Sequence, residues 1–166
     1  MLNTPELTST VPFDYFRIDN FLTDEHKALR DRVRAFVQND VMPHINPYWE
    51  RAEFPMEIAL KLKDLGVIGG MIRGHGSAGL DPLAMGLVMY ELSKGDGSIT
   101  TFYGVHSGLA MGSIGLLGSD EQRERWLPAM SRLETIGAFA LTEPERGSAV
   151  VDLQTTARRD GDSYIL

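Results

Sequence analysis

Residues 99–117 carry no formal charge unless His106 is protonated, and this feature constrains the fold of the chain more than any other. A helix that faces lipid needs about 20 nearly continuous apolar residues. The stretch contains threonine, serine and glycine, so we predict a helix buried on most sides within a protein and no membrane span. Gly104, Gly108 and Gly112 lie four apart, on one face of that helix. We expect another backbone to approach this face, because only close packing compensates for the helix stability that glycine loses.

Four further helices are predicted from their start signals, because Ser, Thr and Asp cap helix N-termini and proline fits the first turn. The predicted starts are Thr23, Pro55, Asp81 with Pro82, and a capping box of Ser119 with Gln122. The predicted ends are Pro43 with Pro47, Gly66, residues 94–97, and Pro128 as a kink or stop. The apolar stripes are Leu29, Val33, Phe36 and Val37, then Ile58, Leu62 and Leu65, then Leu83, Leu87 and Tyr90.

The pattern changes at Ile136. Residues 136–141 are a short apolar run typical of a strand, and residues 153–159 and 163–166 flank a predicted hairpin turn at residues 160–162. We therefore predict a mainly α fold, α+β overall: an irregular arm (1–20), a helical domain (21–135) and the first strands of a β domain (136–166). Because the sequence ends on an apolar strand edge, which natural domains avoid, we expect a truncated sequence.

Composition excludes several classes of site. The sequence contains no cysteine, which excludes disulfides, thiolate metal ligands and thiol nucleophiles. His44, His75 and His106 lack metal-ligand spacing, so we expect structural or surface histidines and no metal site. The net charge of −7 disfavours a nucleic-acid partner, which requires a clustered basic surface. Residues 1–16 lack the basic start and apolar core of a signal peptide.

One glycine-rich segment matches a nucleotide-binding pattern. Residues 74–79 satisfy G-x-G-x-x-G, and residues 67–72 could form a strand before them. Dinucleotide binding by this motif requires strand, turn and helix in a parallel βαβ unit, with an acidic residue in a second strand. The preceding elements are predicted to be helices and no well-placed acid follows. A plain loop is therefore favoured, with a Rossmann-type binder as the alternative.

A second segment carries a more specific pattern. Residues 139–148 read FALTEPERGS, in which an apolar run enters a loop shaped by Pro144 and Gly147. Such a loop presents backbone N–H groups and hydroxyls to a ligand, or it is only a tight turn in which Ser148 satisfies the backbone. The segment resembles the F-x-L-T-E-P-x-x-G-S-D signature of acyl-CoA dehydrogenases and oxidases.

The resemblance covers roughly residues 14–166. Four other motifs occur in the order found in that family: AEFP at residues 52–55, VHSGL at 105–109, GSDEQ at 118–122 with a later Leu-Pro pair at 127–128, and TTA at 155–157. Within the family, the chain resembles the glutaryl-CoA dehydrogenase group and, more closely, its short-chain acyl-CoA oxidase relatives.

The resemblance implies that this loop holds FAD. Leu141 and Thr142 are expected to donate to the isoalloxazine ring, and Phe139 and Ala140 to pack near it. Donors at the pyrimidine end stabilise the negative charge that develops there, which makes the flavin a better hydride acceptor.

Three further loop positions concern the phosphate side of the ligand. The resemblance implies that Gly147 lets the backbone approach the ligand and that Ser148 binds a pyrophosphate or the thioester substrate. The family usually has Asp after the Gly-Ser pair, where Ala149 stands in this chain. An Asp would hold the turn through side-chain to backbone hydrogen bonds, so we expect a weaker pyrophosphate contact.

The expected acyl pocket also departs from the glutaryl-CoA dehydrogenase pattern. Those enzymes carry an arginine that pairs with the distal carboxylate of the substrate and an acidic residue nearby, and Thr100 and Ser93 stand at the matching positions. Without the cation a buried carboxylate would be unpaired, so we predict a neutral acyl chain. Thr100 and Thr101 are candidate substrate residues, with ordinary helix threonines as the alternative.

The family reaction removes an α-proton with a carboxylate and transfers the β-hydride to flavin, which yields a trans-2-enoyl-CoA. The resemblance places the glutamate base, and a tryptophan that packs on the flavin, beyond Leu166. No catalytic residue is therefore assigned, and we expect this chain alone to be inactive. The glutamates expected to be solvated helix charges or loop residues are Glu91, Glu121, Glu124 and Glu143.

The implied partners are an acyl-CoA substrate and further copies of the protein in a homotetramer, with an electron-transfer flavoprotein or oxygen as the electron acceptor. The expected location is the bacterial cytoplasm, or an organellar matrix in a eukaryote. Two alternatives stay open at this point: a catalytically incomplete helical interaction module derived from the same fold, and an acyl-CoA oxidase that uses oxygen.

Overall fold

The structure is a computed structural model that describes residues 17–166, so residues 1–16 of the predicted N-terminal arm lie outside the described part. The helices are η1 (Ile18–Phe21), α1 (Asp24–Phe36), η2 (Val37–Val41), α2 (Asn46–Arg51), α3 (Met56–Ala59), η3 (Leu60–Leu65), α4 (Pro82–Gly95), α5 (Gly97–Tyr103), η4 (Gly104–Ala110), α6 (Met111–Leu117), α7 (Asp120–Ser131) and η5 (Val150–Asp152). The strands are β1 (Arg158–Asp160) and β2 (Ser163–Ile165). None of the described helices is both long and apolar enough to cross a membrane.

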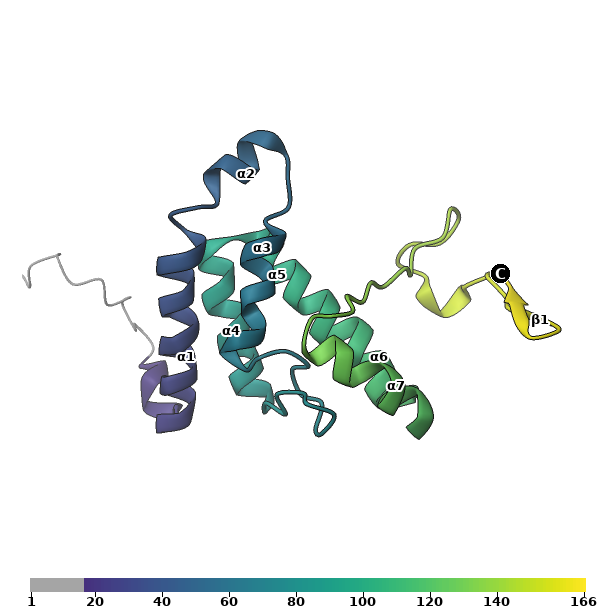
Figure 1. The fold of residues 1–166 in the computed structure, drawn as a ribbon, viewed down its shortest axis with the longest axis horizontal. Helices are drawn as coiled ribbons and strands as arrows, with labels where there is room; N and C mark the ends of the chain where they lie inside the picture. Colours follow the sequence, from purple (N-terminus) through teal and green to yellow (C-terminus); the bar gives the residue numbers. More distant parts are fainter. Residues whose placement is uncertain (1–16) are drawn as a thin grey trace, which may run out of the picture.

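The helices form the bundle that the sequence predicts. α1 packs along α4, and α4 packs in turn on α5 and η2. α6 and α7 pack against each other beside this group, as Figure 1 shows in green. The core between these helices is apolar, and Val33, Leu62, Val88, Ile99 and Met111 are all fully buried in it. Burial of each such side chain contributes about 1.5 to 3 kcal/mol, which makes this core the main source of stability.

The predicted helix starts are confirmed. The Thr23 hydroxyl accepts the His26 N–H at 3.2 Å, and the His26 ring accepts from the Thr23 backbone in return. Ser119 and Gln122 form the expected capping box, with N···O distances of 3.2 and 2.8 Å. Asp81 caps α4 through its carboxylate. These caps satisfy N–H groups that a helix end leaves without partners, so local sequence decides where these helices begin.

The charge-free stretch forms the predicted long helix, but its glycines pack differently from the expectation. α5, η4 and α6 run on continuously, and η4 is a π-helical segment with a wider turn. A Cβ at Gly104 would lie 3.4 Å from the terminal methyl of Met89, and one at Gly108 would lie 3.5 Å from that of Met85. Gly112 has nothing within 4 Å. The glycine face therefore receives methionine side chains from α4 and no backbone.

Two details of the helices differ from the sequence prediction. Leu83 and Tyr90 were predicted to share the buried stripe of α4 with Leu87, but they are 43% and 58% exposed. The buried face is turned toward Val88 and its neighbours, because α4 packs on α1 and α5 at once. Of the kink or stop predicted at Pro128, the stop does not occur at that residue, because α7 continues to Ser131. Proline removes one backbone donor, and the buried side chains on either side of it outweigh that loss.

The chain after α7 leaves the helical body, as Figure 1 shows in yellow-green and yellow. The predicted hairpin is confirmed: β1 and β2 are antiparallel, with Arg158 opposite Ile165, and Gly161 takes a positive φ of 59° in the turn. Its first strand is shorter than predicted, because β1 begins at Arg158 and residues 153–157 are not part of a strand. The strand predicted at residues 136–141 is wrong for this structure. That segment is extended but pairs with no other strand among the described residues, and a β-strand is completed only by a partner.

The G-x-G-x-x-G segment is a loop between η3 and α4. Gly74, Gly76 and Gly79 have positive φ angles of 82°, 75° and 64°. Residues 67–72 form turns with no strand, and the one sheet of residues 17–166 is the β1–β2 hairpin. The Rossmann-type alternative is therefore wrong, because no parallel βαβ unit surrounds the glycines.

Candidate functional site

The first half of the FALTEPERGS segment is extended and presents its backbone. Phe139 and Leu141 are 41% and 39% exposed, and Ala140 and Thr142 are also exposed. Within residues 17–166, the backbone N–H groups of residues 138–142 donate to no other group of the chain. These free N–H donors lie next to the apolar side chain of Phe139. They could pair with the carbonyl oxygens of a flat ring in a ligand, or with the carbonyl groups of a neighbouring strand.

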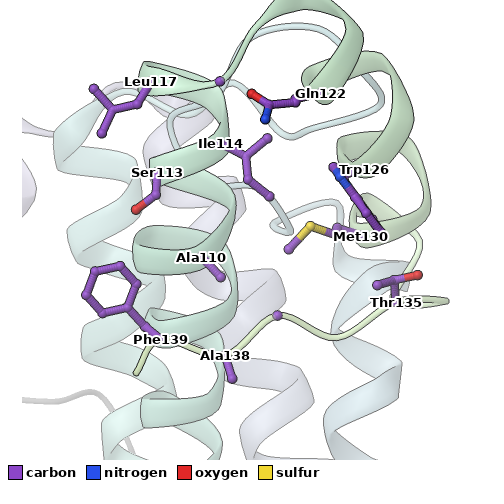
Figure 2. Close-up of a pocket in the computed structure, with 12 residues that line it drawn as sticks. Ala110, Ser113, Ile114, Leu117, Gln122, Trp126, Met130, Thr135, Ala138 and Phe139 are labelled. Atoms are coloured by element: carbon purple, nitrogen blue, oxygen red, sulfur yellow. The ribbon is translucent and has the colours of Figure 1, made fainter. Parts of the chain in front are cut away.

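An apolar hollow of about 530 Å³ lies between α6, α7 and this segment. Figure 2 shows Phe139 beside the long helix, and Ala138, on the same segment as Phe139, below Ala110 of that helix. Gln122, Trp126 and Met130 face the hollow from α7, because residues four apart share one face of a helix. Its remaining lining residues are Ser113, Ile114, Leu117, Gly118, Thr135 and Gly137.

The second half of the segment is a tight turn held by Glu143. The Glu143 N–H donates to the Arg146 carbonyl at 3.0 Å, and the Arg146 N–H donates back at 3.1 Å. The Glu143 carboxylate accepts the N–H groups of Gln154 and Thr155 at 2.9 and 2.7 Å, and these backbone donors lower its pKa. The turn therefore brings the TTA motif at residues 155–157 against the signature segment. Glu143 has a structural use here.

Gly147 and Ser148 lie on the exposed side of this turn. A Cβ at Gly147 would meet nothing within 4 Å, so space for a ligand exists beside the backbone. Ser148 is exposed, and its hydroxyl has no recorded partner within residues 17–166. Ala149 begins the short turn η5 and makes no side-chain cap. The predicted ligand contacts of Gly147 and Ser148 stay predictions.

The two candidate substrate threonines differ in their surroundings. Thr100 is 9% exposed, and its hydroxyl donates to the Asp96 carbonyl at 2.9 Å. Thr101 is exposed and faces a second hollow of about 580 Å³ that Trp49, Phe54 and Phe102 also line. Of the two, only Thr101 has a side chain available to a ligand, although the role of each stays a prediction.

The aromatic hollow is organised by the N-terminus of α5. Asp96 accepts the Ile99 N–H at 2.9 Å with one carboxylate oxygen and the Trp49 indole N–H at 2.8 Å with the other. The Phe54 and Phe102 rings lie 5.5 Å apart. One buried carboxylate therefore caps the helix and holds Trp49 over its first turn.

Comparison with known proteins decides the family. Residues 23–134 match the family model described as Acyl-CoA dehydrogenase, N-terminal domain. The chain belongs to the acyl-CoA dehydrogenase family.

Three relatives show how far the likeness extends. The 3-(aryl)acrylate reductase of Clostridium sporogenes is 37% identical over 147 residues, which cover 88% of this chain and 39% of the relative. The mitochondrial isovaleryl-CoA dehydrogenase of Bos taurus is 36% identical, and the match covers 99% of this chain and 39% of that enzyme. The crystal structure of a glutaryl-CoA dehydrogenase from Mycobacterium smegmatis in complex with FADH2 superposes with a TM-score of 0.86 at 36% identity, over 94% of this chain and 40% of that one. The chain thus spans about two fifths of the length of each of these acyl-CoA dehydrogenase relatives.

The carboxylate base of the reaction is a prediction from the resemblance, and the structure shows where four glutamates of this chain lie. Glu121 and Glu124 are exposed on α7, as expected. Glu91 was expected to be a solvated helix charge, but this is wrong: its side chain is fully buried and bonded to Arg34 and Lys94. With Glu143 held in its turn, none of these four side chains is a free carboxylate next to the signature segment.

The structure also shows the contacts of the histidines in this acyl-CoA dehydrogenase chain. His44 Nδ1 forms a hydrogen bond with the Asp40 carbonyl at 3.2 Å, and His75 Nδ1 lies 3.5 Å from Glu124 Oε1. Within residues 17–166, no group of three His, Asp or Glu side chains is placed to hold a metal ion. His106 is fully buried next to the signature segment, a location that sequence reasoning missed. One feature of the sequence could have indicated this location: apart from a tyrosine, His106 is the one ionisable side chain in residues 99–117.

Proposed function

We propose that the protein carrying this chain is an FAD-dependent acyl-CoA dehydrogenase that oxidises a short acyl-CoA thioester to the trans-2-enoyl-CoA. The observation that carries the proposal is the signature segment, whose free backbone donors border an apolar hollow in a chain of this family. In this proposal residues 21–135 are the helical domain and residues 136–166 begin the β domain. FAD, when bound, supplies the acceptor for the hydride that leaves the substrate β-carbon.

The residues present fit this cofactor. The pyrimidine end of a flavin carries carbonyl oxygens, and residues 138–142 offer N–H donors with no competing partner among the described residues. We assign the ring contacts to Leu141 and Thr142, with Phe139 and Ala140 packed near the ring. Gly147 and Ser148 then lie where a phosphate could approach the backbone. Donors fixed in this way stabilise the charge that accumulates during hydride transfer without reorganisation of solvent.

A neutral acyl chain is the substrate that the aromatic hollow supports. Its lining residues are all uncharged: Trp49, Phe54, Gly97, Ser98, Thr101 and Phe102. A distal carboxylate in this hollow would have no cationic partner among the lining residues, and in this proposal the complete protein covers the open hollow, where an unpaired charge would be costly. The relatives named above are a 3-(aryl)acrylate reductase, an isovaleryl-CoA dehydrogenase and a glutaryl-CoA dehydrogenase, so the family itself leaves the acyl group open. Our choice of a short chain follows the resemblance to short-chain members.

In this proposal the α-proton is taken by a base other than the four glutamates considered above. Glu91 is buried in ion pairs and Glu143 is bonded to two backbone donors. We propose that the base comes from outside residues 17–166 and that the 166-residue chain alone is inactive. By the same family resemblance we propose a homotetramer, which sedimentation of the complete protein would test.

The test is an anaerobic titration of the complete, FAD-loaded protein, followed through the flavin absorbance bands. Butyryl-CoA should bleach the flavin, and glutaryl-CoA should bind more weakly than butyryl-CoA. We assign one ring hydrogen bond to the Thr142 hydroxyl, so Thr142→Val, which removes that hydroxyl and keeps the backbone N–H, should weaken FAD retention about threefold to tenfold, the effect of one neutral hydrogen bond. Thr156→Val, an exposed threonine after the turn, is the matched control and should leave retention unchanged.

The outcomes separate the alternatives. A folded protein that never retains FAD would overturn the enzyme and support a non-catalytic helical module. Tighter binding of glutaryl-CoA would overturn the neutral substrate. Rapid reoxidation by oxygen, with no need for an electron-transfer flavoprotein, would identify an oxidase.

A further inference from the structure

His106 connects the long helix to the signature segment. The ring is fully buried within η4. Its Nε2 lies 3.1 Å from the Met130 carbonyl at the end of α7, and its Nδ1 lies 3.0 Å from the Gly137 backbone nitrogen. A carbonyl can only accept and a backbone N–H can only donate. The proton is therefore on Nε2, and Nδ1 is a bare acceptor. One neutral imidazole thus holds two segments that are 24 and 31 residues away in sequence.

The contact at Gly137 is close enough to exclude any side chain. A Cβ there would lie 2.6 Å from the Cβ of Ala110 and 2.6 Å from the terminal methyl of Met130. Real Cβ atoms do not approach so closely, so the backbone passes against the helix only because residue 137 is glycine. Figure 2 shows the chain running on directly from this point through Ala138 to Phe139 beside the hollow. The orientation of Phe139 and the donors after it therefore depends on where Gly137 is held.

The surroundings of the ring keep it neutral. Three described groups are recorded against it: Phe102 of α5, stacked at 5.9 Å with an interplanar angle of 5°, the Met130 carbonyl and the Gly137 N–H. None of these three titrates. Burial lowers the pKa of His106, and the Met130 carbonyl opposes this shift only in part. A protonated ring would keep its Nε2–H bond to the Met130 carbonyl, but it would lose the acceptor at Nδ1 and set an Nδ1–H group against the Gly137 N–H.

We propose that His106 is a positioning residue: its bare Nδ1 fixes Gly137 and thereby aims the row of free N–H donors at residues 138–142 toward the flavin. The ligand named here rests on the proposed function, whereas the clamp itself does not. η4 supports the role, since π-helical turns are rare and are frequent at functional sites. His106 lies within this π-helical segment and contacts both Met130 and Gly137.

Two amide variants dissect the clamp, because each keeps one of its two bonds. In His106→Asn the side-chain oxygen occupies the position of Nδ1 and still accepts from Gly137. In His106→Gln the side-chain nitrogen occupies the position of Nε2 and still donates to Met130. A role in packing alone would favour His106→Gln, because the larger side chain leaves the smaller cavity, whereas a clamp on Gly137 favours His106→Asn.

The first measurement is nuclear magnetic resonance on the wild-type chain. Long-range ¹⁵N–¹H correlation should show an unprotonated Nδ1 and a protonated Nε2 at pH 7. Hydrogen exchange of the Gly137 amide should be at least tenfold slower in His106→Asn than in His106→Gln. A protonated Nδ1, or equal exchange in the two variants, would refute the clamp. A protonated Nδ1 in the wild type would refute the clamp even if a variant fails to fold.

The second measurement uses the complete FAD-loaded protein. His106→Gln should weaken FAD about threefold to tenfold more than His106→Asn and shift the flavin absorbance band, the effect of one misplaced donor set. Equal FAD affinity and equal spectra in both variants would refute the aiming role. If no variant and no wild-type protein binds FAD, the proposed function fails, while the exchange data still judge the clamp.

Discussion

Arg34 on α1 holds the fully buried Glu91 on α4 with two hydrogen bonds, Nη2 to Oε1 at 2.8 Å and Nε to Oε2 at 3.1 Å. Lys94 adds a contact of 3.0 Å to the same carboxylate. Burial by itself raises the pKa of Glu91, but the hydrogen bonds from Arg34 and Lys94 outweigh it and hold the pKa below its ordinary value. The pair therefore fixes how the first helix lies on the central one.

Removal of the cation should destabilise the fold. In Arg34→Met the buried Glu91 loses its main partner, and breaking a buried pair costs about 3 to 5 kcal/mol. We expect the lower end, because the Arg34 side chain is 23% exposed and solvent screens part of the interaction. Urea unfolding should show this loss, and Arg34→Met with Glu91→Leu should recover most of it. Arg32→Met, on the exposed face of α1, should change the free energy of unfolding far less. Equal effects at positions 32 and 34 would contradict the buried pair.

Two glycines on α4 should respond in opposite directions to alanine. A Cβ at Gly95 would lie 2.7 Å from a methyl of Val37 and 3.2 Å from one of Val41, so Gly95→Ala should cost about 1 to 3 kcal/mol by overpacking. Gly86 is exposed and has nothing within 4 Å, so Gly86→Ala should add about 0.5 to 1 kcal/mol through helix propensity. Thermal unfolding of both variants measures the contrast. Stabilisation by Gly95→Ala would show that α4 lies farther from η2.

Stability should fall on mild acidification because of His106. Its pKa is lowered in the folded chain by burial, so the unfolded chain binds the proton more readily. The stabilisation is therefore complete above the unfolded value of about 6.5 and is lost as pH falls below it, with a slope of at most about 1.4 kcal/mol per pH unit. Urea midpoints between pH 7.5 and 5.5 should drop more in the wild type than in His106→Asn. The carboxylates with lowered pKa values act only at lower pH.

Ala149, the residue after the Gly-Ser pair, should leave the turn at η5 less stable than an acidic residue would. Ala149 precedes η5 and offers no side-chain acceptor to the N–H groups that follow. Ala149→Asp restores the family residue and should stabilise the turn by about 0.5 to 1 kcal/mol, as an N-terminal cap does. Slower hydrogen exchange at Val151 and Asp152 would show it. Ala149→Asn separates the hydrogen bond from the added charge, and Ala149→Val should give no protection.

Much of the candidate site could be predicted from residues that act locally. Thr23, Asp81 and Ser119 decide helix starts with hydroxyls and carboxylates only three residues from their partners. The order of residues in the FALTEPERGS segment is enough to predict the family, and Gly161 marks a turn that needs a positive φ. Each of these signals depends on neighbours within a few positions, which is why a linear reading captures them.

What could not be predicted depends on partners far away in sequence. Glu91 looks like any solvated helix charge until Arg34, 57 positions earlier, is packed against it. The face of α4 that is buried depends on α1 and α5 together, so Leu83 and Tyr90 could not be assigned from periodicity alone.

The sequence by itself determined the helical bundle and the family, and it predicts which segment faces the ligand, because caps, periodicity and motifs are short-range properties of the chain. Only the tertiary structure decided that residues 136–141 stand unpaired, that methionines fill the glycine face, and that His106 holds Gly137. These facts depend on which surfaces meet when distant segments are packed, since burial and hydrogen-bond partners are defined only by that packing.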